Sequence, residues 1–132
     1  MKGIADTGFL VAFLNRRDLH HKWARALAAT VDEPLLTCEA VLAETAYHIQ
    51  SVALTLRLIE TGLVRLSFSL APSTARIQAL ASRYADRNPD LADLCLICLS
   101  EANPTLPILT VDSDFQIYRR NHRDLIPIIL PG

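Results

Sequence analysis

The stretch GIADTGFLVAFL (residues 3–14) decides how this chain should fold. Its apolar residues Ile4 and Ala5 predict a short buried strand, and the apolar run 10–14 predicts a helix. Between them stands Asp6, at the carboxyl end of the predicted strand, where its carboxylate can also cap the helix. A strand that leads directly into a helix is typical of α/β proteins with a parallel sheet.

The rest of the chain continues this alternation. Further strand patterns occur at residues 35–37, 64–68, 107–111 and 125–130, and further helical patterns at residues 18–31, 38–50, 54–62, 72–84 and 91–102. Pro127 favours an edge position for the last strand. We therefore expect residues 1–132 to form a single α/β domain with a mainly parallel central sheet of about five strands and helices on its faces.

Composition excludes several classes of protein. The 132 residues include thirteen Lys and Arg against fourteen Asp and Glu, a formal net charge of -1, which argues against a histone-like nucleic-acid binder. Three cysteines without a disulfide framework indicate a reducing, cytoplasmic setting. We expect no signal peptide and no contact with a membrane, because the apolar runs are short or interrupted by charge.

Four of the acids lie in apolar segments: Asp6, Glu44, Asp93 and Asp112. Two of them, Asp6 and Asp112, follow predicted strands, and ligands of parallel sheets bind outside the carboxyl ends of strands. An ionised carboxylate is costly to bury alone, and four together raise each other's pKa values. A divalent cation removes both costs, and oxygen ligands suit Mg²⁺ or Mn²⁺.

Each acid also has a purely structural interpretation. Asp6 could serve only as a helix cap, Glu44 could lie on a solvated helix face, and Asp112 could be a turn residue. Asp93 could stabilise the first turn of its helix, although Asp90 is better placed as the cap. The case for chemistry therefore depends on the four acids as a set.

Taken in order, four segments resemble the PIN domain family, and within it the VapC-like toxins of type II toxin–antitoxin systems: residues 4–10, 40–44, 93–97 and 109–115. The resemblance implies a three-layer α/β/α sandwich and a metal-dependent ribonuclease. It also implies that Asp6, Glu44, Asp93 and Asp112 are the catalytic, metal-binding acids, with Mg²⁺ or Mn²⁺ as cofactor. Without these four, ten acids stand against thirteen bases.

Other residues are expected to assist these acids. Asp114 is an auxiliary metal ligand through water, and Thr7 and Thr110 can hydrogen-bond the carboxylates. We expect Arg119 and Arg120, and a second cluster at Arg16 and Arg17, to contact RNA phosphates or an antitoxin.

Helix geometry predicts how three of the histidines are placed. His20 and His21 diverge on a helix and are predicted to be exposed, whereas His48 shares a helix face with Glu44 and could support it.

The function predicted from the sequence is therefore an endoribonuclease, most specifically the toxin of a toxin–antitoxin pair. Its expected partners are RNA, a cognate antitoxin and a second copy in a homodimer. The alternatives are a housekeeping RNA-processing nuclease of the same family and a non-catalytic interaction domain that keeps the fold.

Overall fold

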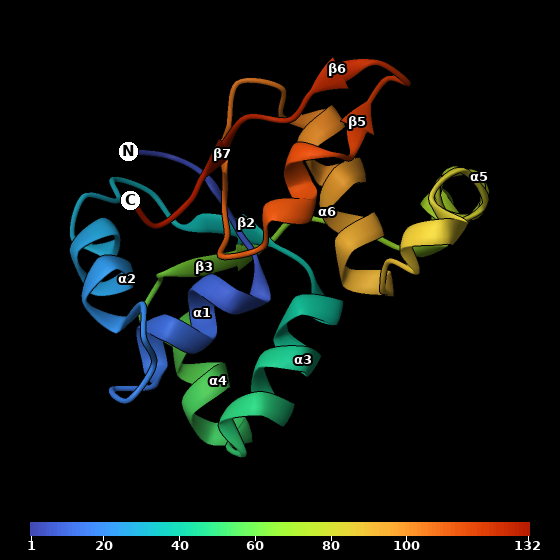
Figure 1. The fold of residues 1–132 in the computed structure, drawn as a ribbon. Coiled ribbons are helices and arrows are strands. Elements are labelled where there is room, and N and C mark those ends of the chain that lie inside the picture. The colour runs from blue at the N-terminus through green and yellow to red at the C-terminus, as the bar shows by residue number, and fades with distance from the viewer.

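A computed structural model describes residues 1–132 and contains a central sheet of five strands. The strands are β1 (Ile4–Ala5), β2 (Leu35–Thr37), β3 (Val64–Leu66), β4 (Ile108–Leu109) and β7 (Ile128–Ile129). Their order is β3-β2-β1-β4-β7, and every neighbouring pair is parallel. The expected parallel sheet of a three-layer α/β/α sandwich is confirmed (Figure 1).

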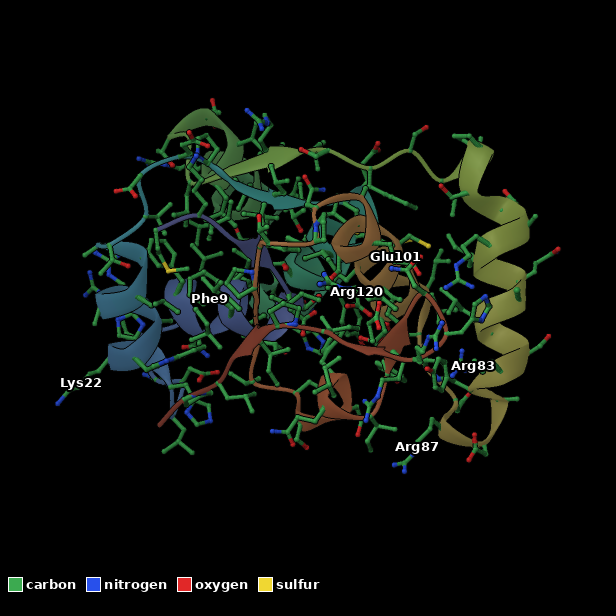
Figure 2. The ribbon with its side chains drawn as sticks, turned by 90° about the horizontal axis from the view of Figure 1, so that it is seen from above. Phe9, Lys22, Arg83, Arg87, Glu101 and Arg120 are labelled. Carbon is green, nitrogen blue, oxygen red and sulfur yellow. The ribbon has the colours of Figure 1, made fainter.

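Six α-helices surround the sheet: α1 (Thr7–Leu14), α2 (His21–Ala28), α3 (Glu39–Ile49), α4 (Val52–Glu60), α5 (Thr74–Arg83) and α6 (Leu91–Ala102). Helix α6 coincides with its predicted range, and seven of its residues are buried because its sequence is apolar on nearly every side. Phe9 of α1 is also fully buried (Figure 2). None of the helices is long and apolar enough to cross a membrane.

The strand order places a topological switch between β1 and β4. From β1 the chain builds outward through β2 and β3, and it later returns to add β4 and β7 on the other side of β1. Ligands of such sheets bind at the carboxyl ends of the two strands that flank the switch.

The predicted strand at residues 125–130 is divided. Asp124–Leu125 forms β6, which pairs antiparallel with β5 (Arg119–Arg120), and only Ile128–Ile129 joins the main sheet, at its edge. Pro127 separates the two pieces because it has no N–H for a ladder, while its carbonyl accepts a hydrogen bond from Ile108.

Two helices show contacts that their sequence patterns do not reveal. On α4, Leu54 and Ile59 are exposed, and the buried side chains are Thr55 and Leu58. Arg76 of α5 forms a bidentate pair with Glu101 of α6, with distances of 2.7 and 3.1 Å. This pair joins α5, which lies at one side of the molecule in Figure 1, to the central helix α6.

Candidate active site

The acids predicted from the sequence gather at the carboxyl edge of the sheet. Asp6 follows β1 directly, and Asp112 follows the neighbouring strand β4. Helix α3, which carries Glu44, begins just after β2, and α6 brings Asp93 in its first turn. The switch between β1 and β4 therefore lies beside these acids.

An open pocket of about 350 Å³ lies at this edge. It is lined by six carboxylate residues: Asp6, Asp18, Glu44, Asp90, Asp93 and Asp112. The other lining residues include two histidines, and no lysine or arginine lines the pocket. The four predicted catalytic acids thus share one cavity, whereas Asp114 does not line it.

Asp6 is the most enclosed of the acids, with 5% of its surface exposed. One carboxylate oxygen accepts a hydrogen bond from the backbone N–H of Thr7 (2.7 Å), as expected for a helix cap. The other accepts from the hydroxyl of Thr110 (2.6 Å). Asp6 is therefore both the cap of α1 and a carboxylate held in a fixed orientation in the pocket.

The two threonines act as predicted. Thr7 Oγ1 donates to Glu44 Oε1 (2.6 Å), which joins the first turn of α1 to the middle of α3. Thr110 Oγ1, besides donating to Asp6, accepts the backbone N–H of Asp112 (2.9 Å). Each hydroxyl thus orients a pocket carboxylate.

Asp90 and Asp93 form a capping box at the start of α6. Asp90 Oδ1 accepts the backbone N–H of Asp93 (2.9 Å), and Asp93 Oδ2 accepts the backbone N–H of Asp90 (3.4 Å). Both side chains nevertheless line the pocket, and Asp90 lies within hydrogen-bonding reach of Glu44. The sequence correctly identified Asp90 as a cap but missed it as a residue of the site, because capping accounts fully for its position.

Asp112 and Asp114 belong to the turn after β4. Asp112 Oδ1 accepts the backbone N–H of Asp114 (2.8 Å), so Asp112 caps the short 3₁₀ helix Ser113–Gln116 and lines the pocket. Any role of Asp114 through an intervening water stays a prediction.

The charges in the pocket change the acidity of its members. Burial, opposed by the Thr110 hydrogen bond, raises the pKa of Asp6 to about 6. Burial and the neighbouring Asp90 raise the pKa of Glu44 to about 7, against the opposing Thr7 hydrogen bond. Burial, then the charges of Asp90 and Asp6, raise the pKa of Asp93 to about 8. The pocket thus disfavours the ionised forms of its carboxyl groups, as expected of a site that binds a cation.

By donor type, these side chains fit a hard divalent cation. Carboxylate oxygens are the ligands that Mg²⁺ and Mn²⁺ prefer, and a bound cation would favour the ionised form of these acids, which burial disfavours. No three of the His, Cys, Asp and Glu side chains are grouped as a ready-made ligand set. Direct contact from one or two carboxylates, with water as the remaining ligands, is sufficient for Mg²⁺.

Two of the arginines predicted to contact RNA or an antitoxin lie outside the pocket. Arg119 donates to the carbonyls of Gln116, Ile117 and Tyr118, and neither it nor Arg120 lines the pocket. Arg120 donates to Ser100 of α6 and to the carbonyl of Pro104, just after this helix. The structure gives both side chains a role in the fold that the sequence did not indicate, and their contact with RNA or an antitoxin stays a prediction.

Two further pocket residues come from positions that sequence reasoning did not assign to the site. Asp18 and His20 lie in the segment between α1 and α2, and Asp18 Oδ1 accepts the backbone N–H of His20 (2.8 Å). His48 lines the pocket one helical turn after Glu44, a placement that their four-residue spacing had indicated. Exposed Arg16 and Arg17 lie in the same segment, immediately before Asp18.

Comparison with known proteins agrees with the fold. The family model described as PIN domain matches residues 4–121, which include every residue of the pocket. No curated protein matches the chain.

Proposed function

The chain belongs to the PIN domain family, whose members are generally nucleases that use divalent metal ions, and we propose that it is an endoribonuclease dependent on Mg²⁺ or Mn²⁺. The observation that carries this proposal is the convergence of six carboxylates around one pocket at the switch between β1 and β4. A non-catalytic domain has no need of three carboxyl groups with raised pKa values in one cavity.

The pocket acids serve two purposes in the proposed reaction, metal binding and proton transfer. Asp6, Glu44, Asp93 and Asp112 would hold the cation, and Thr7 and Thr110 fix the orientation of two of these carboxylates through their hydroxyls. When bound, Mg²⁺ or Mn²⁺ supplies Lewis acidity, which makes water a stronger acid and offsets charge on the phosphodiester. One pocket carboxylate accepts the proton of the attacking water.

The experiment is RNA cleavage by the purified protein with Mn²⁺, with Mg²⁺ and with EDTA. We expect cleavage with either metal ion and none with EDTA, and products that carry a 5′-phosphate and a 3′-hydroxyl. Asp124→Asn is the matched control for Asp6→Asn, because Asp124 is an exposed acid of β6 outside the pocket. Cleavage that survives both EDTA and Asp6→Asn would disprove the proposal.

We further propose that the nuclease is the toxin of a type II toxin–antitoxin pair and acts as a homodimer. Support for a protein partner comes from exposed apolar side chains on α3 and α4: Tyr47, Val52, Leu54, Leu56 and Ile59. An apolar surface of this kind marks an interaction site. Growth arrest on expression that a small adjacent open reading frame relieves would support the toxin, and growth without arrest would favour a housekeeping RNA-processing nuclease.

Exposed Arg16 and Arg17 are the arginines best placed to contact RNA phosphates. They stand next to Asp18 and His20 of the pocket lining, and no hydrogen bond within the chain uses their guanidinium groups. Charge reversal at these two positions should weaken RNA binding, which an electrophoretic mobility assay would measure. The same change at Arg119 and Arg120 tests the other predicted contact.

A further inference from the structure

The wall of the pocket formed by α3 and the α1–α2 segment carries two histidines, His20 and His48. They are the only lining side chains that can bear a positive charge, since the remaining charged side chains of the lining are six carboxylates. Neither histidine is explained by the core, because His20 is half-buried and His48 is exposed.

Each imidazole is held in place without use of its nitrogens. The backbone N–H of His20 donates to Asp18, and its ring meets the edge of Trp23 at 6.3 Å between centroids. The ring of His48 meets Tyr47 at 5.6 Å. No hydrogen bond within the chain reaches either ring, so their N–H groups are free for a ligand.

The two other histidines of the chain behave differently. The Nδ1 atom of His21 lies 2.7 Å from the carbonyl oxygen of Ala12, and the ring of His122 lies beside Arg83 near the β5–β6 hairpin. Neither lines the pocket. The two histidines whose ring nitrogens form no hydrogen bond within the chain are therefore the two that line the pocket with the acids.

A phosphodiester that enters this pocket meets a shortage of hydrogen-bond donors. The hydroxyl protons of Thr7 and Thr110 are already donated to Glu44 and Asp6. A neutral imidazole keeps one N–H donor and a charged imidazole has two, so each ring can bond a phosphate oxygen in either protonation state.

We propose that His20 and His48 are substrate-contact residues that hold the RNA backbone phosphates in the pocket. This inference rests on the proposed nuclease function and assigns part of its substrate site.

The first test needs no activity. The four histidines give four Cε1–Hε1 imidazole signals in a proton–carbon NMR spectrum, and a short 2′-O-methyl RNA is titrated into the metal-free protein, which lacks the cation that the proposed cleavage requires. We expect the signals of His20 and His48 to shift with one shared affinity, and those of His21 and His122 to stay in place. Equal shifts at all four, or RNA binding that leaves His20 and His48 unmoved, would overturn the inference.

The second test separates phosphate contact from metal binding. We expect the His20→Asn/His48→Asn double variant to raise KM for RNA about 10-fold or more with a much smaller change in kcat, because a contact made equally in ground and transition states changes KM alone. Mn²⁺ affinity, measured by calorimetry, should be unchanged. His21→Asn is the matched control, since its ring faces Ala12.

These outcomes distinguish the inference from the proposed function. Loss of Mn²⁺ affinity in the double variant would make the histidines metal ligands and overturn the inference, although the nuclease would remain. A wild-type protein that binds the RNA analogue through His20 and His48 but cleaves no RNA with any divalent metal would contradict the nuclease and leave the binding site intact.

Discussion

At the scale of single residues, Asp6 combines more constraints than any other acid. Its carboxylate is buried, takes hydrogen bonds from Thr7 and Thr110, and has its pKa raised to about 6. We expect Asp6→Asn to lower RNA cleavage by about 100-fold or more. The same change should stabilise the metal-free protein at pH 8 by up to about 3 kcal/mol, because a buried charge is removed.

Urea unfolding with EDTA at pH 8 measures the second effect. Asp124→Asn, at an exposed position of β6, should alter neither cleavage nor stability. A destabilised Asp6→Asn protein at this pH would show that the ionised carboxylate is a net stabilising group in the pocket.

Thr110 tests the idea that hydroxyls orient the metal-binding acids. Thr110→Val keeps the shape of the side chain but removes the donor to Asp6 Oδ2 and the acceptor for the Asp112 N–H. We expect Mn²⁺ affinity to fall about 10-fold or more, as for other partners of metal ligands. Calorimetric titration measures it, and Thr110→Ser, which keeps the hydroxyl, should retain near wild-type affinity.

At the scale of elements, Gly8 sets how closely α1 approaches the end of β4. A Cβ atom at this position would lie 2.3 Å from Cγ2 of Val111, the residue before Asp112. We expect Gly8→Ala to destabilise the protein by about 1–3 kcal/mol and to displace Asp112. Thermal unfolding measures the first effect and RNA cleavage the second.

The double variant Gly8→Ala/Val111→Ala removes the atom that Cβ would strike and should recover most of the lost stability. If the single variant is as stable as wild type, the contact between α1 and Val111 is looser than the structure indicates.

Helix α5 depends on the pair between Arg76 and Glu101. Glu101 also accepts the backbone N–H of Asn121 (2.7 Å), so it joins α5, α6 and the β5–β6 hairpin. We expect Arg76→Ala to cost about 1–3 kcal/mol, because Glu101 is left with one partner fewer. Hydrogen exchange should become faster across α5 while α3 is unaffected.

Lys22→Ala is the control for this change. Lys22 is exposed on α2 and points away from the molecule (Figure 2). Unchanged exchange in α5 of the Arg76→Ala protein would show that apolar packing of Ile77 and Leu80 alone holds the helix.

The elements that could be predicted from the sequence are those with a local signal. Helix α6 carries its cap at Asp90 and an apolar sequence throughout, so both its range and its burial were predicted. The exposure of Leu54 and Ile59 could not be predicted. Periodicity shows that a helix has an apolar face, but not whether another part of the molecule packs against that face.

The same distinction applies to the candidate site. Asp6, Glu44, Asp93 and Asp112 stand out as acids in apolar segments, and the structure brings them to one pocket. Arg119 and Arg120 were predicted as contacts only because they belong to a run of basic residues. No sequence pattern indicates that they donate hydrogen bonds to backbone carbonyls. The pocket position of His20 could not be predicted, because adjacent histidines are expected to point in different directions. The structure shows that the two do diverge, and that His20, not His21, faces the pocket.

At the scale of the whole molecule, the pocket makes stability depend on pH. The pKa values of Asp6, Glu44 and Asp93 rise in the folded state to about 6, about 7 and about 8. The folded chain then binds more protons than the unfolded chain above about pH 4, so the free energy of unfolding falls as the pH rises toward about 8.

We therefore expect the metal-free protein to be more stable near pH 5 than near pH 8. Urea unfolding at a series of pH values measures this difference, and Asp93→Asn should reduce it. Millimolar Mn²⁺ should restore stability at pH 8, because a ligand that binds only the folded state stabilises it. A metal-free protein that gains stability over this range would contradict the raised pKa values.

The hydrogen bond between Thr110 and Asp6 joins residues 104 positions apart. During synthesis, a chain that has emerged only as far as α5 holds Asp6 and Glu44 but neither Asp93 nor Asp112. Since β4 must also pair with β1 before Thr110 can reach Asp6, the pocket closes late, after most of the chain has left the ribosome. The proposed endoribonuclease, assembled in this order, would not cleave the messenger that encodes it until translation is nearly complete.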